Sequence, residues 1–208
     1  MGTSSKVLIT ETVGTHNVYS CMAAIAVADE LSVPVVTAAE SLLKLQTSPG
    51  RMKIIPGIKA TLIIDDTYNS SPVACEQALQ ALKELSYAKR KIAVLGDMLE
   101  LGKYSASEHR RIGAKVAETA NVLFAVGIRA QNIAEGALSA GMSEKNIFQY
   151  EDVSRVSREL QNFLKLGDIV LIKASQGVRA EKIVEEVMAE PQKAEALLVR
   201  QDTEWKKI

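Results

Sequence analysis

The chain has 208 residues, of which 47% are hydrophobic, and its 25 Lys and Arg residues are balanced by 25 Asp and Glu residues. This length allows one well-filled core, or one domain and part of another, and the balanced charge argues against nucleic acid or an anionic membrane surface as a partner. The N-terminus lacks a signal-peptide pattern and no apolar run approaches the ~20 residues that span a bilayer, so we expect a protein of the reducing cytoplasm.

The sequence before residue 60 predicts only three regular elements. They are a strand at Lys6–Val13, a helix at Val18–Leu31 and a shorter helix at Thr37–Leu45. Turn chemistry follows at residues 47–50 and at Pro56-Gly57. Because these elements are too few to close a sheet, we place a domain junction within residues 56–66 and divide the chain into domains 1–59 and 60–208.

From residue 60 onward, short apolar runs alternate with amphipathic helical stretches, which is the pattern of a parallel α/β sheet. The strand candidates are mostly continuous apolar runs, as expected for strands covered on both faces. They are Thr61–Ile64, Ile92–Leu95, Val122–Val126, Ile147–Tyr150 and Ile169–Ile172. The helices between them are marked by Ser71-Pro72, a Ser105–Glu108 capping box, a left-handed Gly141 and a capping Asp152, and a last helix is predicted at Arg179–Met188.

Polar residues follow three of these strands at their carboxyl ends, where parallel sheets carry their ligands. Asp65, Asp66, Tyr68 and Asn69 follow the first strand, Asp97 and Glu100 the second, and Lys173 and Ser175 the last. Each set also has a plain structural interpretation: a solvated loop for the acidic pair, a turn cap for Asp97 and a surface lysine for Lys173. Together, three polar strand ends indicate one edge that faces a shared cleft.

Two residues before the sheet are further candidates. Asn17 either caps a helix or offers both a donor and an acceptor to an adenine edge. Arg51 lies in a turn, where its guanidinium is either solvated or suited to phosphate oxygens. Trp205 is a candidate to hold the charged C-terminal tail against the body.

Several common motifs are absent. Without a GxxxxGK[ST] or GxGxxG loop, no backbone cradle for a triphosphate is predicted, and the absence of GxSxG and HExxH argues against hydrolases and metalloenzymes. Cys21 and Cys75 have neither disulfide-framework nor zinc-site spacing, so we expect two buried thiols and no metal site.

Four ordered segments resemble the motifs of the Mur ligase family. They are His16-Asn17, Gly50–Met52, the DDTYNSSP string at Asp65–Pro72 and the GDMLELG string at Gly96–Gly102, and Lys173–Ser175 is similar to the family's K-G-S motif. The resemblance extends from about Lys6 to Ile208. It implies that residues 1–59 end a central ATP-binding domain and that residues 60–208 form a Rossmann-like C-terminal domain. The family's UDP-sugar domain, its P-loop and its Mg²⁺ ligands are expected to lie outside this chain.

Both strings are typical of the family member that adds D-alanyl-D-alanine to UDP-N-acetylmuramoyl-tripeptide. The implied reaction belongs to peptidoglycan synthesis, and so to cell-wall biogenesis, cell shape and cell division: ATP converts the tripeptide's carboxylate to an acyl phosphate, which the dipeptide amine attacks. The resemblance assigns ATP binding to Asn17, Arg51, Asp65, Asp66, Tyr68 and Asn69, and substrate binding to Asp97, Glu100, Lys173 and Ser175. No proton-transfer role follows from the sequence. Because the P-loop is expected to lie outside this chain, we expect no turnover from this chain alone.

The chain departs from the family pattern at two positions. Ser20 replaces a second Asn, which weakens one expected nucleotide contact, and Gln176 replaces the Arg of K-G-S-R, which puts dipeptide or phosphate recognition there in doubt. A folylpolyglutamate-type relative is disfavoured by the GDMLELG string. A stand-alone nucleotide- or dipeptide-binding module, completed by a partner chain, remains an alternative. Uncovered apolar helix faces and strand edges predict that residues 6–57 pack irregularly or exchange with another copy, so we expect a monomer or an exchange-prone fragment.

Overall fold

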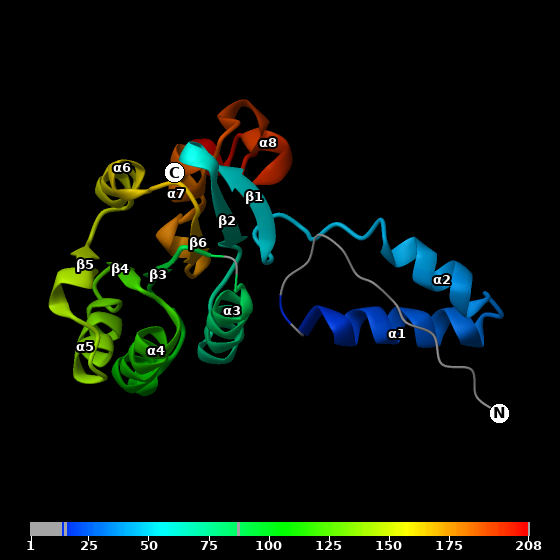
Figure 1. Cartoon of the computed structure of the whole chain (residues 1–208), viewed down its shortest axis with the longest axis horizontal. Helices are drawn as coiled ribbons and strands as arrows, with labels where there is room; N and C mark the ends of the chain where they lie inside the picture. The colour runs from blue at the N-terminus through cyan, green and yellow to red at the C-terminus, as the bar shows by residue number, and fades with distance from the viewer. Residues whose placement is uncertain (1–13, 15, 87, 208) are drawn as a thin grey trace.

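The computed structural model describes Gly14 and residues 16–86 and 88–207. Figure 1 shows a hairpin of two helices that stands away from an α/β body and is joined to it by an extended segment. The hairpin consists of α1 (His16–Glu30) and α2 (Val35–Leu42), so both predicted helices are confirmed with shifted ends. The strand predicted at Lys6–Val13 lies outside the described residues.

The body is built on one six-stranded sheet with the order β1-β2-β6-β3-β4-β5. Its strands are β1 (Lys53–Gly57), β2 (Thr61–Asp66), β3 (Arg90–Gly96), β4 (Val122–Val126), β5 (Ile147–Tyr150) and β6 (Asp168–Lys173). The five predicted strands are confirmed, and β2 to β6 run parallel to one another. The fold class is therefore α/β, as the alternating pattern predicts.

The sequence does not predict β1, because Pro56 and Gly57 indicate a break. The strand forms nonetheless, antiparallel to β2 with Lys53 opposite Asp65 and Gly57 opposite Thr61. Pro56 is tolerated because β1 lies at the edge of the sheet, where a missing N–H donor is least costly. The sheet thus extends across the division proposed at residues 59 and 60, and that division stays a prediction.

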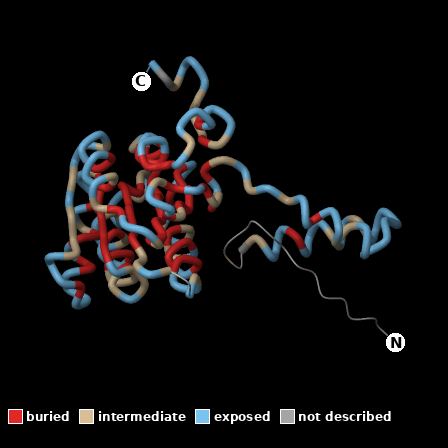
Figure 2. Tube along the Cα trace, turned by 45° about the horizontal axis from the view of Figure 1, so that its top comes forward, coloured by how far each residue is buried: buried red, intermediate tan, exposed pale blue. Residues whose placement is uncertain are grey.

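Helices cover both faces of the sheet. One face carries α3 (Pro72–Glu84), α4 (Ser105–Thr119) and α5 (Gln131–Ser139), the other carries α6 (Val153–Phe163) and α7 (Glu181–Val187), and the short α8 (Ala194–Leu197) follows. Alternate strand residues supply the two cores: Ile64 and Leu171 belong to the first, and Ile63 and Val170 to the second. Figure 2 shows the buried residues concentrated in this body.

Most helix-end predictions are confirmed. Ser71 accepts a hydrogen bond from the Ala74 N–H, Asp152 accepts from Ser154 and Arg155, and Gly141 is left-handed at φ 95° after α5. The Ser105 capping box is wrong, because a 3₁₀ turn at Gly102–Tyr104 runs directly into α4 and leaves Ser105 already helical. The last helix begins at Glu181 rather than Arg179, since Arg179 adopts a left-handed φ of 63°.

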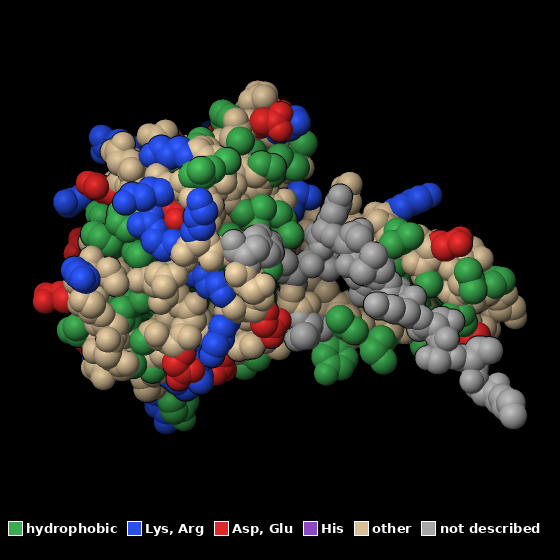
Figure 3. All heavy atoms as spheres, viewed as in Figure 1, with side chains coloured by type: hydrophobic (Ala, Val, Ile, Leu, Met, Phe, Trp, Pro, Cys, Tyr) green, Lys and Arg blue, Asp and Glu red, His purple; other side chains and the backbone are tan. Residues whose placement is uncertain are grey.

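The hairpin is the least buried part of the described chain. Its exposed apolar side chains include Val18, Tyr19, Met22, Val27 and Leu31. Figure 3 shows apolar atoms on its surface, whereas Lys and Arg side chains gather on the face of the body that is turned toward the viewer, mostly away from the hairpin. Cys21 and Cys75 are both free and buried, as predicted. Within the described residues, no helix has the length and apolar character needed to cross a membrane.

Candidate functional site at the strand ends

The carboxyl ends of β2, β6 and β3 lie side by side at one edge of the sheet, since these strands are parallel neighbours. This arrangement gathers most of the predicted site residues, and the segment before β1 adds another. We call the group formed by Arg51, Asp65, Asp66, Tyr68 and Lys173 the strand-end site.

A buried ion pair lies at the centre of the strand-end site. Asp66 and Lys173 are register partners on β2 and β6, and the Lys173 Nζ lies 2.7 Å from the Asp66 Oδ2. The ammonium also donates to the Asn69 carbonyl oxygen at 2.9 Å, and the Asp66 Oδ1 accepts from the Met52 N–H at 3.2 Å. The Lys173 side chain is only 2% exposed, so its interpretation as a surface lysine is wrong.

Asp65 is buried and connects two loops. Its Oδ2 accepts from the Gly50 N–H at 3.1 Å, and its Oδ1 accepts from the Thr67 hydroxyl at 2.6 Å and the Thr67 N–H at 3.2 Å. Burial raises the pKa of Asp65 from 3.8 to about 6, although these hydrogen bonds oppose the rise. The carboxylate therefore fixes the segment before β1 to the end of β2.

Arg51 and Tyr68 form the exposed part of the site. The Arg51 guanidinium carbon lies 4.1 Å from the centre of the Tyr68 ring, and the Tyr68 N–H donates to the Gly50 carbonyl oxygen at 3.0 Å. Stacking on the ring holds the cation in one place while its N–H groups still face solvent. An oriented, hydrated guanidinium of this kind is suited to binding an anion such as a phosphate.

The end of β3 joins the same edge through Ser175. The Ser175 hydroxyl accepts from the Leu99 N–H at 2.9 Å, and the Ser175 N–H donates to the Asp97 carbonyl oxygen at 3.0 Å. The Asp97 carboxylate accepts from the Ala130 N–H at 2.7 Å, so it caps the turn that opens α5. Gly127 is required beside it, because a Cβ there would lie 2.6 Å from the Asp97 Oδ1.

The side chains of the other predicted site residues lie apart from this buried network. Glu100 is exposed, in the loop after β3, with a left-handed φ of 65°. Asn69 is exposed, and its Oδ1 accepts from the Ser70 N–H at 2.8 Å. Asn17 lies in the first turn of α1, on the hairpin rather than the sheet.

Two buried residues that support the site are not predicted by any sequence pattern. His109 in α4 accepts from the Met98 N–H at its Nε2 at 2.9 Å, and its Nδ1 lies 2.7 Å from the Ser105 carbonyl oxygen, so it fixes the loop that follows β3. Arg200 donates to the carbonyl oxygens of Thr67 and Tyr68. His109 follows the GDMLELG string by only seven residues, but Arg200 is too distant in sequence for any local signal.

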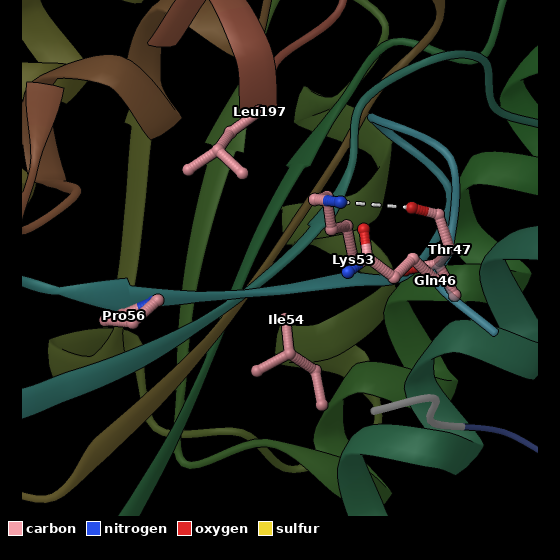
Figure 4. Close-up of a pocket in the computed structure, with 6 residues that line it drawn as sticks. All are labelled: Gln46, Thr47, Lys53, Ile54, Pro56 and Leu197. Atoms are coloured by element: carbon pink, nitrogen blue, oxygen red, sulfur yellow. Dashed lines mark hydrogen bonds between the residues drawn. The ribbon is translucent and has the colours of Figure 1, made fainter. Parts of the chain in front are cut away.

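A pocket of about 370 Å³ adjoins this edge on the outer side of β1. It lies between the segment Gln46-Thr47, the β1 residues Lys53, Ile54 and Pro56, and Leu197 of α8. Figure 4 shows the Lys53 ammonium directed at the Thr47 carbonyl oxygen, a hydrogen bond of 3.1 Å. The pocket therefore lies beside the chain segment that links the hairpin to the body.

The described residues contain no cluster of three or more His, Cys, Asp or Glu side chains that could hold a metal ion. Asp65 and Asp66 are adjacent, but both are engaged in contacts within the protein. This edge therefore does not fit Mg²⁺ by itself. The Arg51 guanidinium on the Tyr68 ring does fit a phosphate group.

An open parallel sheet with polar residues gathered at its strand ends defines a ligand-binding α/β domain. The model of the family described as Mur ligase, glutamate ligase domain, matches residues 50–176, which is more than half of the chain. The chain belongs to the Mur ligase family.

Relatives of known function cover most of this chain but are much longer. The UDP-N-acetylmuramoyl-tripeptide–D-alanyl-D-alanine ligase of Bacillus subtilis is 32% identical over 179 residues, which are 86% of this chain and 39% of that protein. The ligase of the same name from Mycobacterium leprae is 32% identical and covers 79% of this chain and 35% of its own. The chain thus spans less than half the length of these relatives.

Solved structures of the same kind of ligase also resemble this chain over less than half of their own length. A MurF ligase from Thermotoga maritima in complex with ADP superimposes with a TM-score of 0.72 at 27% identity, covering 91% of this chain and 41% of that one. MurF from Acinetobacter baumannii also gives a TM-score of 0.72, at 30% identity, covering 82% and 37%. The fold is therefore that of the Mur ligase C-terminal domain, and the family resemblance of the motifs is confirmed.

Proposed function

We propose that this chain supplies the C-terminal domain, and the segment leading into it, of an ATP-dependent ligase that joins D-alanyl-D-alanine to UDP-N-acetylmuramoyl-tripeptide in the cytoplasm. The observation that carries the proposal is the strand-end site, where an exposed arginine stacked on Tyr68 lies beside the buried Asp66–Lys173 pair. The DDTYNSSP and GDMLELG strings and the ligases similar to this chain support the same substrates.

In the proposed nucleotide site, the Arg51 guanidinium binds phosphate oxygens and so helps to balance the charge that develops on the transferring phosphoryl group. Asp66 accepts from the ribose hydroxyls with the lone pairs that Lys173 and Met52 leave available, while Asp65, Tyr68 and Asn69 shape the loop around them. Asn17 is assigned to the adenine, which requires the hairpin to lie over the nucleotide.

In the proposed dipeptide site, Asp97, Glu100, Lys173 and Ser175 line the face toward β3. Glu100 supports this role best, because its exposed carboxylate can pair with the ammonium group of an incoming dipeptide. Lys173 contributes through the strand-end ion pair rather than by direct contact, since its ammonium group is already engaged by Asp66 and Asn69.

Phosphate release from ATP in the presence of UDP-N-acetylmuramoyl-tripeptide and D-alanyl-D-alanine tests the proposal. The assay compares this chain alone with a chimaera in which the preceding part of the Bacillus subtilis relative is joined to it. We expect turnover only in the chimaera, and loss of that turnover with Arg51→Met. Turnover by this chain alone would contradict the expectation that it is inactive without a P-loop.

A second candidate function is a binding module that a separate P-loop-bearing chain completes. The exposed apolar side chains of α1 and α2 favour it, since a surface of this kind is normally covered by other protein. Mixing this chain with the preceding part of the Bacillus subtilis relative as a separate polypeptide tests the idea. Stable association with restored turnover would support it, and no association would exclude it for that partner.

A further inference from the structure

Near the C-terminus, Arg200 connects three parts of the body that are distant in sequence. Its Nη2 lies 2.9 Å from the Glu181 Oε2 on α7 and also donates to the Thr67 carbonyl oxygen. Its Nη1 donates to the Tyr68 carbonyl oxygen at 3.2 Å. The Arg200 side chain is 5% exposed, and its contacts with Glu181 and the Thr67 carbonyl are partly buried, which strengthens them, whereas its bond to the Tyr68 carbonyl is exposed.

The orientation of this guanidinium favours the loop over the carboxylate. A side-on pair with Glu181 would use Nε and Nη2 together, yet the Nε of Arg200 is buried without a partner. The residue also holds a left-handed φ of 58°. Both costs are offset by donation to two successive carbonyl oxygens at the end of β2, which only the planar fork can reach.

The neighbouring residue reinforces the same contact. A Cβ at Gly50 would lie 2.9 Å from the Val199 Cγ1 and 2.9 Å from the Tyr68 backbone nitrogen, so the C-terminal segment, the Gly50 turn and the Tyr68 loop are packed closely together. Gly50 and Tyr68 are in turn joined by the N–H to carbonyl hydrogen bond of 3.0 Å.

We propose that Arg200 is a positioning residue of the strand-end site: anchored on Glu181, it fixes the Thr67–Tyr68 backbone so that the Tyr68 ring holds the Arg51 guanidinium in place for phosphate. The residue lies outside the stretch that the family model matches, residues 50–176. The effect on phosphate rests on the proposed function, whereas the effect on the loop does not.

The same carboxylate supplies a matched control. The Arg179 Nε lies 2.6 Å from the Glu181 Oε1, and the described hydrogen bonds of the Thr67–Tyr68 carbonyls go to Arg200 rather than Arg179. Because two arginines share Glu181, replacing either one leaves the carboxylate paired. Arg200→Met and Arg179→Met therefore perturb the same cluster, but only the first releases the loop.

Amide hydrogen exchange of the whole chain tests the effect on the loop. We expect Arg200→Met to speed exchange of the Tyr68 amide about tenfold, the loss expected for one charge-assisted hydrogen bond, and Arg179→Met to leave it within about twofold of wild type. In Arg200→Lys, which keeps the charge but not the planar guanidinium, the Tyr68 amide should exchange at a rate between those of the other two variants. If Arg200→Met does not fold, Arg200→Lys is compared with Arg179→Met instead. Equal exchange in the Arg200 and Arg179 variants would overturn the proposal.

Titration with ADP, followed by NMR shifts of Gly50 and Tyr68, tests the effect on phosphate. Arg200→Met should weaken ADP binding about tenfold in the wild-type background and not at all in an Arg51→Met background. An equal loss in both backgrounds would overturn the link through Arg51. If wild type binds no ADP, the assignment of phosphate to Arg51 fails for this chain, and the exchange result alone decides whether Arg200 positions the loop.

Discussion

At the scale of single residues, the strand-end site is held by contacts within the protein before any ligand is present. Asp66 and Lys173 are buried against each other, and Asp65 accepts three hydrogen bonds from the surrounding loops. Buried charges are tolerated only when they are paired, so each member of the site depends on its neighbours. Arg51 differs, because its cation rests on a ring and remains exposed.

Lys173→Met should destabilise the protein by about 3–5 kcal/mol, because it leaves the Asp66 carboxylate buried without its cation. Urea denaturation measures the free energy of unfolding. Lys115→Met is the matched control: Lys115 pairs with Glu118 at 3.3 Å on the surface, and its replacement should cost roughly 0–1 kcal/mol. Equal losses in the two variants would contradict the assignment of a buried ion pair.

Asp65 should make the protein less stable as the pH rises. Its pKa is raised from 3.8 to about 6, so the folded state binds the proton more tightly than the unfolded state does. Its stabilising contribution is therefore full below pH 3.8 and is lost as the pH rises through about 6. The unfolding free energy of wild type minus that of Asp65→Asn should fall across this window, as measured by urea denaturation at several pH values.

The contribution of Asp152 to stability should change with pH in the opposite direction to that of Asp65. Hydrogen bonds from the Ser154 and Arg155 N–H groups lower the pKa of Asp152 below 3.8, so its contribution is present above that pH and is lost on acidification. The difference between wild type and Asp152→Asn should therefore rise with pH. If the free-energy difference changed with pH in the same direction for both variants, the pH dependence would not come from the raised pKa of Asp65.

At the scale of elements, the sequence predicts regular structure well wherever one local signal decides it. Continuous apolar runs locate the five parallel strands, and Ser71, Gly141 and Asp152 mark helix ends as expected. The edge strand β1 is missed because its stability comes from pairing with β2 and not from its own residues. The same holds for the candidate site. The sequence predicts the residues at the strand ends because each follows an apolar strand, but it does not predict Arg200, because that residue depends on tertiary contacts between distant segments.

The contact between α4 and α5 depends on glycine. A Cβ at Gly113 would lie 2.0 Å from the Ile133 carbonyl oxygen, which is backbone and cannot move aside. Gly113→Ala, a change that favours an isolated helix, should here destabilise the protein by about 1–3 kcal/mol in urea denaturation. Ser139→Ala, on the exposed side of α5, should stay within about 0.5 kcal/mol, and a stabilised Gly113→Ala would contradict the close approach.

At the scale of the whole molecule, the hairpin and the body are two separate structures joined by residues 43–52 (Figure 1). The body contains both hydrophobic cores, whereas in the described part of the hairpin only Cys21 and Leu42 are buried. The body should therefore hold its fold without the hairpin.

A shortened chain of residues 46–208 should unfold within about 4 °C of the full chain in a thermal melt, since for a protein of this size a loss of about 1 kcal/mol shifts the midpoint by roughly 2–4 °C. The buried network from Gly50 to Lys173 is retained in that chain, so amide protection in β2 and β6 should also be unchanged. A shortened chain that fails to fold would mean that the hairpin stabilises the body through contacts beyond residues 43–52.

The linking segment enters the body directly beside the strand-end site. Gly50 is fastened to Asp65 and Tyr68, so any swing of the hairpin must turn about the irregular residues 45–48 that precede it. Arg51 lies just before β1 and therefore close to this hinge. Glu100 follows β3, two strands beyond β2 in the sheet, and therefore lies farther from it. One rotation would barely displace a group bound at Arg51, while it would open or shut the space in front of Glu100.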